Sequence, residues 1–240
     1  MDAMETIKLG NTDMRIPKLG MGTWAIGGGP AWGDRDEQEC VTTIQKAVKS
    51  GLNLLDTAPA YNFGNSEKIV GKALEGLERK DVCLITKCGI VWTREGSLFN
   101  KVGDVQLYKN LSAESIRMEI EDSLKRLRTD YLDIYMTHWQ SVEPCFTPIA
   151  ETMDVLNDLK VKAIGAANVT REHIEEYVKY GSLDIVQGKY SILDRQVEKD
   201  LLPACRENGI TFQAYSPLEQ GLLSGKYSRD YQPKGAQANK

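Results

Sequence analysis

Several features that mark other classes of protein are scarce in this 240-residue chain. It has two histidines, and its 30 basic and 34 acidic residues leave a net charge of −4 without a block of like charge. We therefore expect no nucleic-acid partner and no membrane-surface partner. No run approaches the ~18 apolar residues of a membrane span, and the first residues lack the basic region and apolar core of an export signal. We accordingly expect a cytoplasmic protein that acts on small molecules.

The cysteines form neither a disulfide framework nor a metal site. There are five of them, without a C-x-x-C pair and without zinc spacing: Cys40, Cys83, Cys88, Cys145 and Cys205. An odd number of unpatterned cysteines is typical of reduced, mostly buried thiols in the cytosol. We expect no bound metal.

Length and composition predict one domain over residues 1–240, because 41% hydrophobic residues suffice for one large core. After a predicted hairpin between Ile7 and Ile16, apolar strands alternate with helices whose apolar residues recur at helical spacing. Helix starts are predicted at Asp36, Asn65 or Ser66, Ser112, Thr147-Pro148, Thr170 and Asp194. The alternation predicts a parallel α/β fold, either an open doubly wound sheet or a closed barrel.

The barrel is favoured by the positions of polar residues. No G-x-G-x-x-G follows the first strand, as a dinucleotide-binding doubly wound sheet would have. Nearly every predicted strand instead ends in a polar residue: Asp56, Lys87, His138, Asn168, Gln187 and Tyr215. This predicts an eightfold (β/α) TIM barrel, whose active site lies at the C-terminal ends of the strands, with the hairpin as a plug at one end. Only seven strands can be counted before Lys240, so we expect the protein to continue beyond that residue.

Four of these side chains have complementary chemistry: Asp56, Tyr61, Lys87 and His138. A phenol is a poor acid at neutral pH, and an ammonium such as that of Lys87 lowers the pKa of a neighbouring Tyr61. A carboxylate such as Asp56 would keep a partly buried ammonium charged, and His138 could orient a substrate oxygen. Each residue alone has a structural explanation, but the combination at successive strand ends favours a catalytic site. The other histidine, His173, is expected to face solvent in the first turn of a helix.

The chain resembles the aldo-keto reductases in several motifs that occur in the family's order up to about Gly225. They are Gly20–Trp24, Asp56–Glu67, Thr86-Lys87, Tyr131–Trp139, Ile164–Asn168 and Tyr215–Leu218. The details are most similar to the bacterial methylglyoxal-reductase-like and sugar-reductase-like members. The resemblance implies reduction of aldehydes and ketones by hydride transfer from NADP(H), with NAD(H) as the alternative. It also implies that Asp56, Tyr61, Lys87 and His138 are the catalytic tetrad, with Tyr61 as proton donor.

The resemblance further implies which residues contact the cofactor. Asn168 and Gln187 would hold the nicotinamide carboxamide, and Tyr215 would stack on the ring. The complete set of expected contacts is Gly22, Thr23, Trp24, Asp56, Asn168, Gln187, Tyr215, Ser216, Pro217, Leu218, Gln220 and Gly221. Two departures from the family stand out: Ala167 replaces a common serine, and the basic segment that grips a 2′-phosphate is absent. The turn at 159–162 is also short, and residues 227–235 resemble a loop that folds over the pyrophosphate.

Substrate contacts are expected from Trp24, Trp92 and Trp139, together with a long substrate loop at 89–111. These aromatic walls and the mixed charges of the loop favour a small polar carbonyl compound such as methylglyoxal or an open-chain sugar. The protein is expected to be a monomer or a homo-oligomer. Two other classes stay open: a cofactor-binding regulatory subunit resembling the potassium-channel β subunits, and a lyase that uses Lys87 as a Schiff-base amine.

Overall fold

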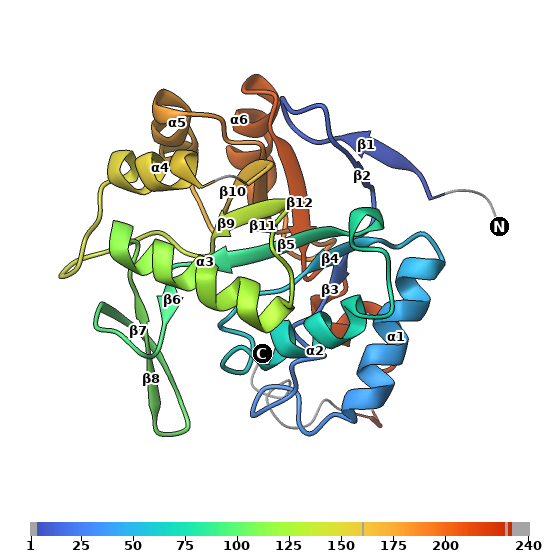
Figure 1. Cartoon of the computed structure of the whole chain (residues 1–240). Coiled ribbons are helices and arrows are strands. Elements are labelled where there is room, and N and C mark those ends of the chain that lie inside the picture. The colour runs from blue at the N-terminus through green and yellow to red at the C-terminus, as the bar shows by residue number, and fades with distance from the viewer. Residues whose placement is uncertain (1–3, 160, 229, 232–240) are drawn as a thin grey trace.

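The computed structural model describes residues 4–159, 161–228 and 230–231, and its centre is a parallel sheet of seven strands. The strand order is β12-β11-β10-β9-β5-β4-β3, and the sheet curls like part of a barrel (Figure 1). Its strands are β3 (Met21–Gly22), β4 (Leu54–Asp56), β5 (Cys83–Cys88), β9 (Ile134–Thr137), β10 (Ala163–Ala167), β11 (Ile185–Lys189) and β12 (Thr211–Tyr215). The predicted seven parallel strands are confirmed, while no strand of the described residues joins β12 to β3.

Six α-helices and three short 3-10 turns connect these strands in the described residues. They are α1 (Glu37–Lys49), α2 (Asn65–Leu74), α3 (Ala113–Leu127), α4 (Ile149–Asp158), α5 (Arg171–Tyr180), α6 (Leu201–Glu207), η1 (Arg79–Asp81), η2 (Gln196–Glu198) and η3 (Glu219–Ser224). Asp36, Ser112 and Thr170 cap α1, α3 and α5 through their side-chain oxygens, as predicted. His173 completes the cap of α5, because its Nδ1 accepts a hydrogen bond from the backbone N–H of Thr170. Its imidazole was expected to face solvent and instead takes part in this capping box.

Two predicted helix starts are wrong. Neither Asn65 nor Ser66 caps α2; the cap position is Gly64, whose φ of 82° lies in the left-handed region that favours glycine. The helix α6 begins at Leu201, and Asp194 lies ahead of η2 instead. Ser66 bonds to Thr23 and Thr57 instead, and Asp194 pairs with Lys189 of β11.

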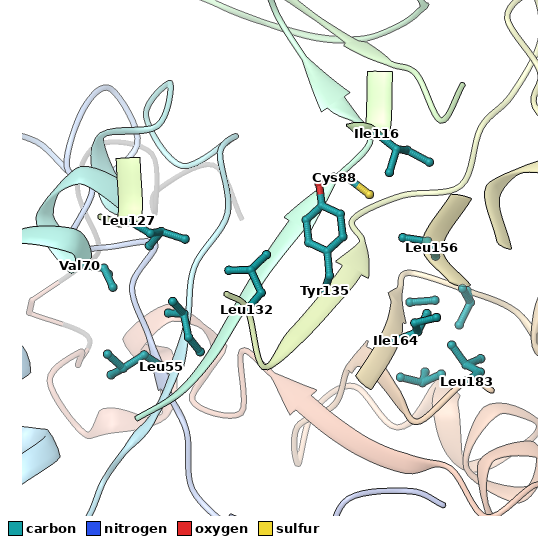
Figure 2. Packing of buried hydrophobic residues seen from close by; sticks show 14 of the residues in the cluster. Leu55, Val70, Cys88, Ile116, Leu127, Leu132, Tyr135, Leu156, Ile164 and Leu183 are labelled. Carbon is teal, nitrogen blue, oxygen red and sulfur yellow. The ribbon is translucent and has the colours of Figure 1, made fainter. Parts of the chain in front are cut away.

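Two apolar cores lie on the two faces of the sheet. The larger one packs the outer face against the helices, with Leu55, Tyr135 and Ile164 from strands facing Val70 and Leu156 from helices (Figure 2). The smaller one fills the inner face with alternate strand residues: Leu54, Ile85, Ile134, Met136, Ala163, Ala167 and Ile185. Leu9 and Ile16, from the hairpin of β1 (Thr6–Lys8) and β2 (Arg15–Pro17), belong to the same inner core. The expected plug is thus confirmed.

The segment at 89–111 is not the irregular loop that was expected. It forms a small antiparallel sheet of β6 (Ile90–Val91), β7 (Ser97–Val102) and β8 (Val105–Lys109), which projects from the body of the molecule (Figure 1). Ser97 fastens it to the loop after β9, because its hydroxyl bonds to Val142 O and the N–H of Cys145. No helix in the part of the chain that the structure describes has the length and apolarity that a membrane crossing requires.

Candidate functional site

A layer of polar side chains lies directly beyond the inner apolar core. Side chains alternate between the two faces of a strand, so the residue two positions after an inward apolar residue also points inward. This relationship holds for Leu54 and Asp56, for Ile85 and Lys87, for Met136 and His138, and for Ile185 and Gln187. The strands are parallel, and their C-terminal ends therefore bring the four polar side chains to one end of the sheet.

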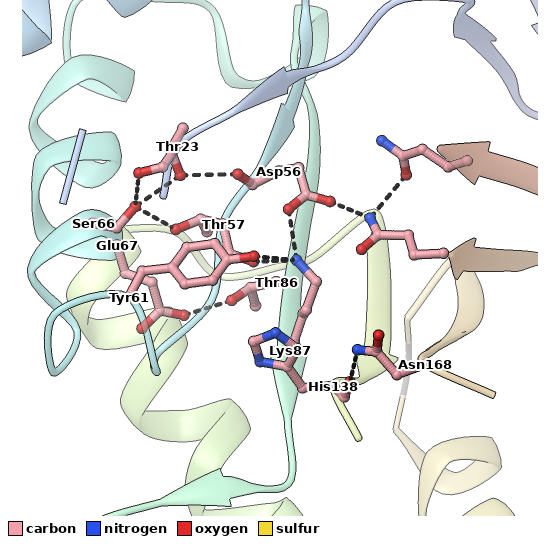
Figure 3. Close-up of polar contacts among 12 residues, drawn as sticks. Thr23, Asp56, Thr57, Tyr61, Ser66, Glu67, Thr86, Lys87, His138 and Asn168 are labelled. Atoms are coloured by element: carbon pink, nitrogen blue, oxygen red, sulfur yellow. Dashed lines mark hydrogen bonds and ion pairs between the residues drawn. The ribbon is translucent and has the colours of Figure 1, made fainter. Parts of the chain in front are cut away.

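Lys87 is the centre of this layer and is 1% exposed. Its Nζ donates to Asp56 Oδ1 at 2.6 Å and to Thr57 O at 2.9 Å, and lies 3.4 Å from the hydroxyl of Tyr61 (Figure 3). Burial by itself would lower the pKa of Lys87, but Asp56 and Tyr61 outweigh it, and the net pKa is raised. The ammonium is therefore charged throughout the physiological range.

Tyr61 lies in the loop between β4 and α2 and points toward Lys87 (Figure 3). Burial raises the pKa of Tyr61 above its usual value, and the charge of Lys87 opposes that rise without cancelling it. Lys87 thus acts on the pKa of Tyr61 in the expected direction, but the net pKa is raised, since the cost of burying a phenolate exceeds the attraction of the ammonium. Tyr61 is a protonated phenol at neutral pH.

His138 completes the group at the end of β9. Its ring lies edge-on to that of Tyr61, with the centroids 5.7 Å apart. Burial, and then the charge of Lys87, lower the pKa of His138 well below its ordinary value, so the imidazole is neutral. Its Nδ1 is buried and has no hydrogen-bond partner among the described residues. A buried polar atom of this kind is available to a ligand.

A second polar group lies on β10 to β12. Asn168 donates from Nδ2 to His138 O at 2.9 Å and accepts from the hydroxyl of Tyr215 at 2.7 Å. Gln187 donates from Nε2 to Asp56 Oδ2 and, at 2.9 Å, to Gln213 Oε1. Among the described residues, no partner is found for the second N–H of Asn168 or for the side-chain carbonyl oxygen of Gln187. This donor and this acceptor fit the two ends of a carboxamide.

The remaining predicted cofactor residues flank this group. Gly22 ends β3, and a Cβ at this position would meet nothing within 4 Å, so the backbone borders open space. Thr23, by contrast, is fully buried, and its hydroxyl bonds to Asp56 O and Ser66 Oγ. Its N–H also donates to Asp56 O, and its carbonyl oxygen accepts from Ser66 and Gly27, so its polar atoms all have partners within the protein. The others lie in the turn after β12 and in η3: Ser216, Pro217, Leu218, Gln220 and Gly221. Their contacts with a cofactor stay predictions.

Two features of the site were not predicted. Ser66 is fully buried, and its hydroxyl connects Thr23, at the end of β3, to Thr57, at the start of the Tyr61 loop. Gln213, on β12, pairs in register with Gln187 and accepts from its amide. A polar residue between Phe212 and Ala214 of the last strand was the available signal for Gln213.

The three tryptophans predicted to contact substrate have different surroundings. The ring of Trp24 is 38% exposed and lies 6.1 Å from that of Tyr61. Trp92 contacts Phe63, which also belongs to the Tyr61 loop, at 5.5 Å. Trp139 packs against Phe99 of β7 instead. Trp24 and Trp92 thus border the Tyr61 loop, and Trp139 supports the small antiparallel sheet.

Comparison with known proteins agrees with this arrangement. A sequence model of the Aldo/keto reductase family matches residues 18–240. The chain is 66% identical to the NADH-specific methylglyoxal reductase of Escherichia coli (strain K12), over 99% of this chain and 74% of that protein. Among solved structures, the glycerol dehydrogenase of Gluconobacter oxydans superposes with a TM-score of 0.84 at 33% identity, over 98% of this chain and 70% of that one. An aldo/keto reductase from Klebsiella pneumoniae in complex with NADP and acetate superposes with a TM-score of 0.72 at 29% identity, over 93% of this chain and 72% of that one.

The match covers nearly the whole chain, and the strand-end chemistry is that expected of a carbonyl reductase. The chain therefore belongs to the aldo/keto reductase family and is an oxidoreductase that reduces carbonyl groups with a nicotinamide cofactor.

Proposed function

We propose that this protein reduces methylglyoxal and similarly small aldehydes with NADH, and that Tyr61 donates the proton. The observation that carries the proposal is the 3.4 Å separation between the Tyr61 hydroxyl and the buried ammonium of Lys87. The name of the Escherichia coli relative supports both the substrate and the cofactor. The K. pneumoniae structure with NADP provides a precedent for the other nicotinamide cofactor.

The proposed roles follow from charge and position. A bound nicotinamide would supply the hydride. Tyr61 would transfer its proton to the carbonyl oxygen, and Lys87 would stabilise the phenolate that remains. Asp56 would keep Lys87 charged, and the neutral His138 would donate a hydrogen bond that orients the carbonyl. The pKa of Tyr61 is raised, so the proton is present at neutral pH, and the charge of Lys87 would assist its transfer to the carbonyl oxygen.

Cofactor binding is assigned in the same proposal. Asn168 and Gln187 would hold the carboxamide, and Tyr215 would lie against the nicotinamide ring. Tyr215 is held by its hydrogen bond to Asn168, which fixes the phenol beside the carboxamide site. The turn after β12 and the open backbone at Gly22 would border the rest of the dinucleotide.

We also propose that residues 1–240 form one domain and that their seven strands are part of an eightfold barrel. The inner core, the hairpin plug and the likeness to the G. oxydans enzyme support this proposal. A cytoplasmic location is proposed because all five cysteines are free thiols.

The Schiff-base lyase is not favoured by the state of Lys87. An amine must lose its proton to attack a carbonyl, and Asp56 at 2.6 Å keeps the pKa of Lys87 raised. Borohydride should therefore trap no substrate on Lys87.

The experiment is a steady-state assay of methylglyoxal reduction with NADH and, separately, with NADPH. We expect turnover with NADH at a kcat/KM at least about tenfold above that with NADPH, a difference of about 1.4 kcal/mol. A bulky steroid ketone serves as the substrate control and should be reduced far less efficiently. Absence of methylglyoxal turnover with either cofactor, or a steroid that outperforms every short aldehyde, would refute the proposed substrate.

A further inference from the structure

The amide of Gln187 is held in one orientation by two acceptors. A glutamine side chain has two N–H donors and one carbonyl acceptor. Both donors of Gln187 are engaged, one with Asp56 Oδ2 and one with Gln213 Oε1 at 2.9 Å. Among the described residues no donor is found for the carbonyl oxygen Oε1. If the amide were rotated by 180°, its carbonyl oxygen would face the acceptor oxygens of Asp56 and Gln213. The observed orientation is therefore the one in which both of these oxygens receive a hydrogen bond.

Gln213 can hold the amide of Gln187 because its own side chain is fixed in position. Gln187 and Gln213 are register partners on β11 and β12, so their side chains leave the sheet side by side. The far end of Gln213 lies against Gly20, where a Cβ would come within 3.2 Å of Gln213 Nε2 and within 3.1 Å of Leu54 Cδ2. The missing side chain at position 20 therefore leaves the space that the Gln213 amide occupies.

Asn168 presents the complementary group. Its Oδ1 accepts from Tyr215, and one N–H of Nδ2 is donated to His138 O. No acceptor is found for the other N–H among the described residues. The backbone N–H of Asn168 bonds to Gln187 O, so the two residues belong to neighbouring strand ends. The two strand ends thus offer one donor and one acceptor in a fixed order.

We propose that Gln213 is a positioning residue of this enzyme, which holds Gln187 so that its carbonyl accepts a hydrogen bond from the NH2 of the nicotinamide carboxamide. The inference rests on the proposed function in one respect, the assignment of the carboxamide to Asn168 and Gln187. It adds that Gln187 acts only as an acceptor and that Gln213, together with Asp56, holds the amide in this role. Gln213 would do so without touching the cofactor. The donor of Asn168 is then left for the carboxamide oxygen.

A cofactor analogue without the NH2 group tests this directly. Reduced 3-acetylpyridine adenine dinucleotide carries a methyl ketone in place of the carboxamide, so it cannot donate to Gln187. In the wild-type protein we expect calorimetry to show that it binds about tenfold more weakly than NADH. In Gln213→Met, which keeps the length of the side chain and removes its acceptor, NADH should lose affinity and the analogue should not. The ratio of the two dissociation constants should then fall to about threefold or less.

Gln213→Glu is the matched control, since it keeps an acceptor oxygen for Gln187. Its added charge acts on both dinucleotides alike, so their ratio should stay near the wild-type value although both constants change. Gly20→Ala is the second variant: it displaces the Gln213 amide without removing it, and its ratio should shift in the same direction as that of Gln213→Met. A general loss of fold would change both constants together and could not produce this pattern.

The outcomes separate the two proposals. If the wild-type protein binds NADH but Gln213→Met and Gly20→Ala keep the tenfold ratio, the role of Gln213 is wrong and the proposed function stands. If the wild-type protein binds both dinucleotides equally, Gln187 is not an acceptor for the NH2 group and the inference is likewise overturned. If it binds neither dinucleotide, the proposed cofactor site fails together with the inference.

Discussion

The Nζ of Lys87 lies 3.4 Å from the hydroxyl of Tyr61, close enough to stabilise a phenolate and too far for a short, strong hydrogen bond to the neutral phenol. This separation favours the state that forms after proton transfer over the state before it. Interactions that are stronger in the transition state than in the ground state accelerate a reaction. In the proposed mechanism, the pair would therefore increase kcat more than it would strengthen substrate binding.

The first prediction concerns the proton donor. Tyr61→Phe keeps the ring beside Trp24 and His138 and removes only the hydroxyl. We expect kcat for methylglyoxal to fall by about a thousandfold, in line with the loss of a general acid, while the dissociation constant of NADH stays within about twofold. Tyr180→Phe, at an exposed position on α5, is the control and should leave both quantities unchanged. A Tyr61→Phe enzyme that retains a tenth of the wild-type rate would exclude Tyr61 as the donor.

The second prediction concerns pH. In the proposed mechanism, reduction requires Tyr61 in its protonated form, and the pKa of Tyr61 lies above its ordinary value of 10.0. The kcat/KM of the wild-type enzyme should therefore be flat through neutral pH and decline only in strongly alkaline solution. His138 should add no acidic limb near neutrality, because its pKa is well below 6.5 and it is already neutral there.

Lys87→Met sharpens this test. Loss of the ammonium removes the charge that opposes the effect of burial, so the pKa of Tyr61 should rise further and the alkaline decline should move to higher pH. The rate at neutral pH should fall by at least about a hundredfold, since the phenolate loses its stabilising charge. An alkaline decline that moves to lower pH in this variant would contradict the assigned pairing.

The sequence predicted correctly that the polar side chains of the site gather at the strand ends, because this position depends only on local patterns. Asp56, Lys87 and His138 each follow an inward apolar residue by two positions, and this period of two can be read from the sequence. Burial decides the direction of the Tyr61 pKa, and burial depends on the whole fold. The net direction of the Tyr61 pKa shift could therefore not be obtained from the two residue types alone.

Other features depend on tertiary contacts that no local pattern indicates. Gly64 occupies the cap position of α2 while Ser66 bonds to Thr23 and Thr57, so the side chain expected as a cap is used elsewhere. The small antiparallel sheet had a local signal that was overlooked: Gly103-Asp104 is a two-residue connection between β7 and β8, and Gly103 has a φ of 59°. Polar residues on both faces of these strands hid the alternation expected of a half-buried strand.

The third prediction concerns the substrate. Trp24 borders Tyr61, whereas Trp139 packs against Phe99 and under the ammonium of Lys109. We expect Trp24→Ala to lower kcat/KM for methylglyoxal about tenfold, mainly through KM, because the wall beside the carbonyl is lost. Trp139→Ala should change this value less and should destabilise the protein more. Equal kinetic effects of the two substitutions would show that Trp139 also contacts the substrate.

The fourth prediction concerns Glu119, a buried carboxyl on α3 that is 4% exposed. It accepts hydrogen bonds from the N–H of Gly89 and the hydroxyl of Ser115. Burial raises its pKa from 4.5 to about 8, although these two hydrogen bonds and the charge of Arg94 lower it, and the charge of Glu67 raises it slightly. The folded protein thus keeps a proton that the unfolded chain loses between these two pH values, so stability should decrease as the pH rises from 4.5 to 8. From the two pKa values, this group should lower the free energy of unfolding by about 4 kcal/mol over that range.

Glu119→Gln keeps an acceptor for Gly89 and cannot ionise, so urea unfolding should show the variant gaining stability over the wild type as the pH is raised from 5 to 8. Glu121→Gln, at an exposed position on the same helix, is the control and should show no such gain. A difference between Glu119→Gln and wild type that stays constant with pH would mean that Glu119 is ionised in the folded protein throughout, stabilised by Gly89, Ser115 and Arg94.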